Sequence, residues 1–195
     1  MNGLLTMEAL IEQLGSTDIM IRHDAREQLL QIGTAAVEPL LRSLSASDNY
    51  HLREAIISVL AEIGDIRAVD ALIQELEHGN LPIRMISAKA LGSFDTPEVF
   101  SALYEHLLSD AVVVQIWIVE SLGKLGDRRA INLLVRVLHA TFSPALRCTI
   151  MQVLAEFGER AAIPHVALYK DDPDEFVRGI AQNTIQRLIG GTYHE

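Results

Sequence analysis

The sequence predicts an all-α fold, a right-handed α-solenoid of about six helix pairs with a period of about 31 residues. Three observations predict it: landmark residues recur at this period, apolar residues within each period follow helical spacing, and capping residues mark the ends of each expected helix. A fixed period of this size is typical of proteins in which each repeat packs mainly on its neighbours.

An arginine is the landmark of the first helix in each repeat. The series, with one substitution and one inserted residue, is Arg22, Arg53, Arg84, Gln115, Arg147 and Arg178. Apolar residues lie one residue before this position and three and seven residues after it, which places them on one helical face. We expect the arginines to be structural and to hydrogen-bond carbonyls or Asp side chains of the next repeat, because buried polar groups need partners.

A glycine eleven residues after the arginine position is expected to end each first helix, because glycine adopts the left-handed conformation at little cost. The series is Gly33, Gly64, Gly126 and Gly158, and Asp95 stands in its place in repeat 3. A second helix follows, with an apolar face such as Val69, Leu72, Ile73 and Leu76. The expected N-caps of the first helices are Asp18, Asn49, Asn80, Ser143 and Asp174.

The expected organisation is a single solenoid over residues 1–195. A helix of the second type, with the apolar face of the second helix of a repeat, is expected at 4–14 and covers the start. Five two-helix repeats fill 17–169, and a helix of the first type at 173–190 covers the end. The outer face of the last helix is polar, as solenoids require of a terminal helix, so we expect a monomer or weak dimer.

The composition excludes several function classes. A formal charge of −10 argues against a nucleic-acid binder, and Cys148 as the single cysteine excludes an intramolecular disulfide. No apolar run reaches the ~18 residues of a membrane span, and the amino terminus lacks the basic start of a signal peptide, so we expect a cytoplasmic protein. The charge is uneven: residues 1–110 hold 17 acidic and 7 basic side chains, and residues 111–195 hold nine of each.

Two segments, LREAIISVLAEIGDIRAVDALIQEL (52–76) and VQIWIVESLGKLGDRRAINLLVRVL (114–138), resemble HEAT repeats of the short bacterial type. This class is named after phycobilisome bilin lyases, and the resemblance extends over residues 4–190. It implies a scaffold whose concave groove is lined by the second helices and holds proteins. The departures at Asp95, at Gln115 and near Leu146 fall in repeats 3 to 5 and predict irregular stacking there.

The outward positions of the second helices predict a partner-binding face that changes from acidic to apolar along the chain. The predicted contact residues are Glu105, His106, Leu133, Arg136, Val137, His139, His165, Leu168 and Tyr169. An exposed apolar patch often marks a binding site. The alternative is that Leu133, Val137 and Leu168 are half-buried against adjacent repeats. Trp117 is either a binding residue or, as we favour, fills a gap between stacked helices.

No catalytic set is evident. Cys148 has no histidine at helical spacing to activate it, so we expect it to pack in the core. Three histidines (His106, His139 and His165) could approach one another on neighbouring repeats, but no carboxylates are evident to complete a metal site, and no metal or cofactor is expected. A HEAT-like iron hydroxylase needs repeated His-Glu pairs, and the sole pair is His194-Glu195. HEAT-like DNA glycosylases need a basic groove, which this chain lacks.

Two functional hypotheses follow. The first, which we favour, is a non-catalytic adaptor that binds a protein partner through the groove, because the scaffold alone does not specify chemistry. The second is a chromophore-handling factor that resembles bilin lyase subunits and holds a bilin during transfer to a phycobiliprotein cysteine, without a nucleophile of its own. A bilin's propionates would favour Arg136, His139 and His165.

Overall fold

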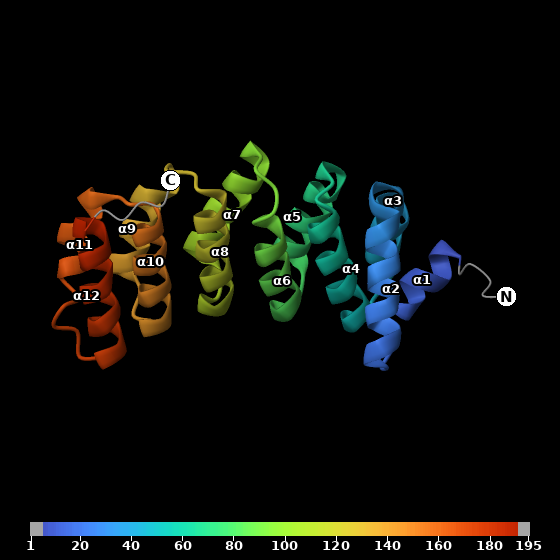
Figure 1. Ribbon diagram of the computed structural model, residues 1–195, viewed down its shortest axis with the longest axis horizontal. Coiled ribbons are helices and arrows are strands. Elements are labelled where there is room, and N and C mark those ends of the chain that lie inside the picture. The colour runs from blue at the N-terminus through green and yellow to red at the C-terminus, as the bar shows by residue number, and fades with distance from the viewer. Residues whose placement is uncertain (1–5, 191–195) are drawn as a thin grey trace. The chain divides into compact units, whose positions relative to one another are not determined.

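The computed structural model describes residues 6–190, so residues 4 and 5 of the predicted first helix and the His194-Glu195 pair lie outside the described part. Over this range the chain forms helices, turns and loops without a strand (Figure 1). The first-type helices are α2 (Ile19–Ile32), α4 (Tyr50–Ile63), α6 (Leu81–Leu91), α8 (Val112–Leu125), α10 (Pro144–Glu156) and α12 (Glu175–Gly190). The second-type helices are α1 (Met7–Gln13), α3 (Val37–Ala46), α5 (Val69–His78), α7 (Pro97–Ser109), α9 (Ala130–Ala140) and α11 (Ile163–Ala167). The alternation confirms the predicted α-solenoid class.

The chain divides into two compact units, Met1–Val99 and Phe100–Glu195. The boundary falls near the start of α7, shortly after Asp95 replaces the expected turn glycine. Each unit is a succession of helix pairs with its own core, and the continuity of one solenoid through both stays a prediction. No helix within residues 6–190 is long and apolar enough to cross a membrane.

The two cores follow the apolar spacing of the sequence. In the N-terminal unit, Leu29 of α2 and Ile56 and Leu60 of α4 are fully buried, as the positions three and seven residues past the arginine predict. In the C-terminal unit, Ile118 of α8 and Ile150 of α10 occupy the same position and are equally buried. Because burial of each such side chain contributes about 1.5–3 kcal/mol, these faces hold the helix pairs together.

The expected helix ends are observed. Side chains cap the first-type helices as predicted: Asp18 accepts from the Met20 amide, Asn49 from His51 and Leu52, Asn80 from Ile83, Ser143 from Leu146, and Asp174 from Phe176 and Val177. The four turn glycines have φ angles of +63° to +69°, the left-handed region that disfavours a side chain. Where Asp95 replaces the glycine, α6 ends early at Leu91 with Gly92 in the right-handed region.

The repeat arginines hold the turn that precedes their own helix. Arg22 donates to the Ser16 carbonyl at 2.7 Å and Arg178 to the Asp172 carbonyl at 2.8 Å. Gln115 preserves the arrangement by donating to the Leu107 carbonyl at 2.8 Å. Arg147 also pairs with the Asp172 side chain just before α12, the kind of acceptor that was expected. For Arg22 and Arg178 the acceptors are carbonyls, as expected, but they lie before their own helix and not in the next repeat. The reason is geometric: the side chain points back over the loop that its helix has just left.

A second set of arginines, which the sequence analysis did not single out, links neighbouring repeats through the glycine turns. Arg67 donates to the Thr34 carbonyl at 2.9 Å, and Arg160 donates to the carbonyls of Leu188 and Ile189 at 3.1 and 3.0 Å. Their acceptors are carbonyls near helix ends, which have no partner inside the helix. The turns that carry Arg67 and Arg160 thus stabilise a neighbouring repeat.

Candidate partner-binding site

The second-type helices of the C-terminal unit present the best-formed part of the predicted contact face. On α9, Ala130, Leu134 and Leu138 face the core, which turns Arg136 and His139 outward. Arg136 makes no ion pair or hydrogen bond with the described residues 6–190, so its charge is free for a ligand. The short helix α11 places His165 beside α9 and leaves Leu168 about 70% exposed.

A cavity of about 620 Å³ lies between α9 and the segment that leads into α11. Arg136 and His165 line it together with apolar atoms of Ile131, Val135 and Ala161. At its edge Arg128 is held by Glu159 at 2.5 Å and by the Phe157 carbonyl at 3.1 Å. The cavity therefore combines one free cation, an imidazole and an apolar floor, a combination that suits a group bearing a carboxylate.

His139 and His165 contact each other directly. Nε2 of His139 lies 3.0 Å from Nδ1 of His165, and the ring centroids are 5.2 Å apart. The Tyr169 hydroxyl donates to the Leu138 carbonyl at 2.7 Å and lies 3.4 Å from Nδ1 of His139. Partial burial, with a smaller contribution from His165, lowers the pKa of His139 below its ordinary value. Burial therefore favours the neutral form of the His139 ring.

Two predicted contact residues lie in the core instead. Leu133 and Val137 are buried, with 1% and 6% of their surface exposed. The alternative prediction, that they pack against adjacent repeats, is therefore closer to the structure, and neither residue can contact a partner. The register explains Val137: it corresponds to Glu75 of α5, which faces the first helix of its own repeat and pairs with Arg53. At this register position Val137 packs in the core and Glu75 pairs with Arg53, and neither side chain points outward.

The remaining predicted residues are more scattered. Glu105 is exposed on α7, and His106 contacts Asp110 at 3.3 Å rather than joining the other two histidines. Tyr169 is partly buried, and the Arg147 guanidinium lies 5.2 Å from its ring centroid, which is a cation–π contact. Tyr169 occupies the register position that Glu75 has in its own repeat. Trp117 is partly buried on α8. The structure thus brings Arg136, His139, His165 and Tyr169 together, and leaves Leu168 exposed just after α11.

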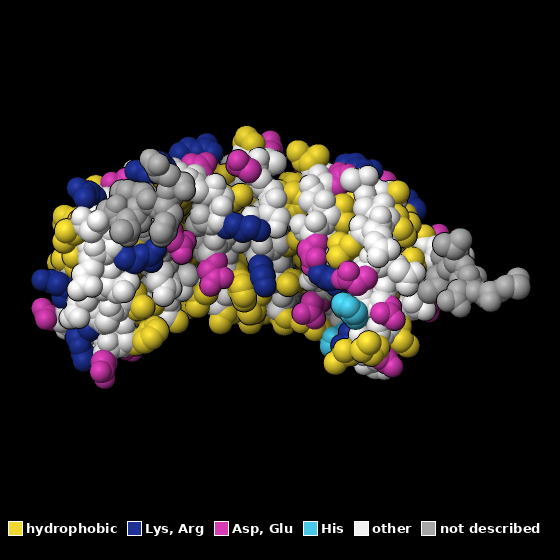
Figure 2. All heavy atoms as spheres, in the orientation of Figure 1, with side chains coloured by type: hydrophobic (Ala, Val, Ile, Leu, Met, Phe, Trp, Pro, Cys, Tyr) yellow, Lys and Arg dark blue, Asp and Glu magenta, His cyan; other side chains and the backbone are white. Residues whose placement is uncertain are grey.

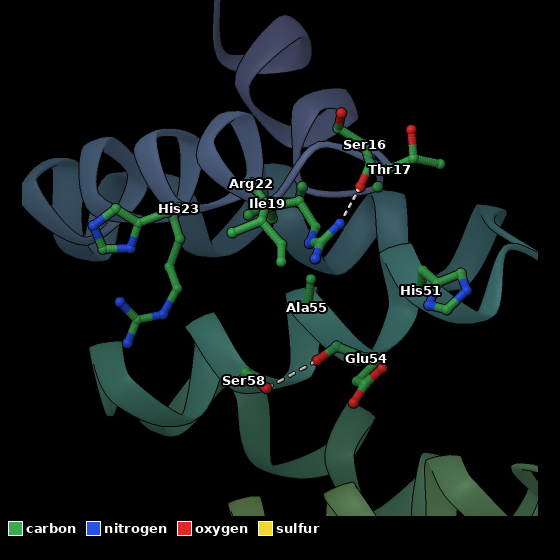
Figure 3. Close-up of a pocket in the computed structure, with 12 residues that line it drawn as sticks. Ser16, Thr17, Ile19, Arg22, His23, His51, Glu54, Ala55 and Ser58 are labelled. Carbon is green, nitrogen blue, oxygen red and sulfur yellow. Dashed lines mark hydrogen bonds between the residues drawn. The ribbon is translucent and has the colours of Figure 1, made fainter.

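The sequence analysis missed a cavity of about 630 Å³ in the N-terminal unit, which has both polar and apolar lining residues. Figure 3 shows Ile19 and Arg22 of α2 facing Glu54 and Ala55 of α4, with the Arg22 guanidinium turned back to the Ser16 carbonyl. Figure 2 shows apolar, histidine and acidic side chains gathered at the lower end of α2 and α4. The predicted contact face lies on the second-type helices, whereas this cavity lies against the first-type helices α2 and α4.

The structure offers little for covalent catalysis. Cys148 is buried, as expected, and its burial raises the pKa of the thiol, with the carboxylates of Asp174 and Asp172 adding to the effect. A buried thiol with a raised pKa is a poor nucleophile. Across the described part of the chain, no group of three or more His, Cys, Asp or Glu side chains converges on one point.

Several known proteins are similar in sequence to this chain along most of its length. The chain is 26% identical to the uncharacterized phycocyanin operon protein Z of Pseudanabaena tenuis, over 94% of this chain and 96% of that protein. It is 28% identical to phycocyanobilin lyase subunit beta of Thermosynechococcus vestitus, over 95% and 83% of the two chains. It is also 28% identical to phycocyanobilin lyase subunit alpha of Picosynechococcus sp., over 65% of this chain and 54% of that protein.

Solved structures agree with this fold. The complex of CpcE and CpcF of phycocyanin lyase from Nostoc sp. superimposes with a TM-score of 0.66 at 24% identity, over 75% of this chain and 96% of that chain. Human deoxyhypusine hydroxylase superimposes with a TM-score of 0.55 at 21% identity, over 94% and 74% of the two chains. At these identities the likeness shows the fold alone.

Family membership rests on the sequence itself. Residues 7–82, 44–113 and 109–186 each match the family of HEAT repeats. The three matches overlap and run through both units, so the resemblance drawn from the arginine, glycine and apolar spacing is confirmed. The chain belongs to the HEAT-repeat family and is related in sequence to phycocyanobilin lyase subunits.

Proposed function

We propose that this protein is a non-catalytic scaffold that binds a protein partner through α9 and α11 of the C-terminal unit. The observation that carries the proposal is the unpaired Arg136 at a cavity with apolar lining residues, in the unit that also exposes Leu168. Arginine and exposed apolar side chains are the groups that contribute most at protein interfaces. The absence of an activated nucleophile around Cys148 fits a scaffold.

The relatives suggest the class of partner. The names of three relatives refer to phycocyanobilin or to a phycocyanin operon. We therefore propose a phycobiliprotein subunit as the partner, with an acidic side chain of that subunit paired with Arg136. An arginine–carboxylate contact can form two parallel hydrogen bonds, which gives direction as well as affinity.

Handling of a bilin is the second candidate function, and the cavity between α9 and α11 favours it. A linear tetrapyrrole has an apolar body and two propionates, and the cavity offers apolar side chains together with Arg136 and His165. Bilin handling would add to partner binding rather than replace it, because a scaffold can hold both the chromophore and its acceptor protein.

Charge reversal at Arg136 tests the proposal. Isothermal titration calorimetry with a phycocyanin apo-subunit is expected to show binding by the unaltered protein and an affinity at least about tenfold lower for Arg136→Glu. The matched control is Arg42→Glu, because Arg42 occupies the same register position on α3 and is also exposed. Equal losses for the two variants, or no binding by any form, would overturn the proposed face.

A visible absorption spectrum separates the two candidate functions. The protein is mixed with phycocyanobilin, and the spectrum is compared for the unaltered chain and for Arg136→Glu. A shifted absorption band that Arg136→Glu abolishes supports bilin handling at the cavity. Partner binding without a shifted band supports the scaffold alone.

A further inference from the structure

The pair formed by His139 and His165 has a use that partner binding does not require. These two side chains come from different helices, α9 and α11, and their facing nitrogens are 3.0 Å apart near the surface of the C-terminal unit. Imidazole nitrogens bind late first-row transition metals, and such ions hold them at about 2.0–2.1 Å. Two nitrogens in adjacent coordination positions then lie about 2.9–3.4 Å apart. The observed separation falls in that range.

The hydrogen bonds around the pair set the proton positions that a metal needs. The Tyr169 hydroxyl gives its proton to the Leu138 carbonyl, so towards His139 it can only accept, from Nδ1–H. His139 therefore carries its proton on Nδ1, and Nε2 presents a lone pair to His165. A ligating histidine in metalloproteins usually donates its second N–H to such an outer partner.

His165 completes the pair by a change of tautomer. Its Nδ1–H now donates to Nε2 of His139. Moving that proton to its own Nε2 through solvent frees Nδ1 as a second lone pair, with no change in net charge. His106 stays outside the pair because it contacts Asp110.

We propose that His139 Nε2 and His165 Nδ1 form a two-ligand site for a late first-row divalent ion, Cu²⁺, Ni²⁺ or Zn²⁺, with water in the remaining positions. The ion would join α9 to α11 across two repeats. Hard ions such as Mg²⁺ prefer oxygen ligands and would not bind. The expected order of affinity is Cu²⁺ above Ni²⁺ and Zn²⁺, with Mg²⁺ inactive.

The test uses the full chain without a polyhistidine tag. Addition of NiCl₂ is expected to raise the melting temperature, because an ion that binds only the folded state stabilises it. His139→Ala and His165→Ala are expected to lose this rise, while His106→Ala is expected to retain it. Circular dichroism before addition verifies that each variant is folded, and MgCl₂ replaces NiCl₂ as the ion control.

Nuclear magnetic resonance locates the ion independently of stability. Sub-stoichiometric Cu²⁺, which is paramagnetic, is expected to broaden the imidazole signals of His139 and His165 first, and those of His106 and His23 only at higher concentration. Broadening of all histidines in parallel, or a melting rise that His139→Ala retains, would overturn the site. Neither readout involves a partner or a bilin, so failure here is separate from failure of the proposed function.

Discussion

The N-terminal and C-terminal units use the same repeat to make different surfaces. Residues 1–99 hold 15 acidic and 7 basic side chains, whereas residues 100–195 hold 11 and 9. The outward second-helix positions follow this difference. Asp70 and Glu77 stand on α5, and Arg136 and His139 stand on α9. Core positions and turns are retained in both units, so the scaffold leaves the outward positions free to specify a partner.

One register position shows how far the interior tolerates change. Glu75 of α5 pairs with the repeat arginine Arg53. The ring of Tyr169, two residues after the end of α11, lies near the guanidinium of Arg147. Val137 of α9 is buried in the repeat where Gln115 replaces the arginine. An acid beside Gln115 would lack a cation, which explains why an apolar residue suits α9. In this repeat the loss of the arginine thus accompanies an apolar residue at the facing position.

The largest expected effect is a similar loss in the free energy of unfolding when either core is altered. Leu72→Ala on α5 and Leu133→Ala on α9 each remove a buried side chain and are expected to lower the free energy of unfolding by about 2–5 kcal/mol. Leu168→Ala, at an exposed position, is expected to change it by less than about 0.5 kcal/mol. Urea unfolding followed by circular dichroism measures all three. A small effect of Leu133→Ala would return that residue to the partner face.

The repeat arginines are expected to differ between the units. Arg147 forms an ion pair at 3.1 Å with the buried Asp172, so Arg147→Ala leaves a buried carboxylate without its cation and is expected to cost about 3 kcal/mol. Arg22 donates only to a carbonyl, and Arg22→Ala is expected to cost about 1 kcal/mol. The same unfolding measurement compares them. Equal losses would mean that closing the turn, rather than the ion pair, is the main role.

A smaller effect depends on pH and is confined to the C-terminal unit. The pKa of His139 is lower in the folded state than its ordinary value of 6.5, because burial and His165 disfavour the charged ring. The unfolded chain thus takes up a proton first, and stability is expected to fall as the pH drops through 6.5. In α3 the corresponding register position is Ser45, so His139→Ser is a conservative change for this repeat. It is expected to reduce the slope of the free energy of unfolding against pH. An unchanged slope between pH 7 and 5 would contradict the assignment.

The smallest expected difference concerns the turn motif that both units share. Arg67 holds the pKa of Asp65 down to about 2, and Arg129 lowers the pKa of Asp127 in the same way. Carboxyl titration by nuclear magnetic resonance is expected to show both groups below 3.8, the ordinary value. Arg67→Ala is expected to raise the pKa of Asp65 and leave that of Asp127 unchanged. A shift of both would show that the turns are coupled.

Local chemistry explains how much of the fold could be predicted. The period, the N-caps such as Asn49 and the turn glycines such as Gly64 depend on residues close in sequence, and the structure confirms them. The 3₁₀ turns η1 (Gly33–Ala36), η2 (Ile66–Ala68) and η3 (Arg160–Ala162) were not expected, because the pattern predicted only a glycine turn between two α-helices. Arg67 and Arg160 were missed as links because their acceptors lie in other repeats.

The sequence by itself determined the HEAT-repeat class, the helix ends and the core positions, because helical periodicity and capping act within a few residues. Only the tertiary structure decided which second-helix residues face outward. The sequence pattern placed Leu133 and Val137 in an exposed apolar patch, but their exposure depends on the neighbouring helices that cover them. The approach of His139 to His165 likewise follows from the stacking of α11 on α9, a distance that no local pattern records.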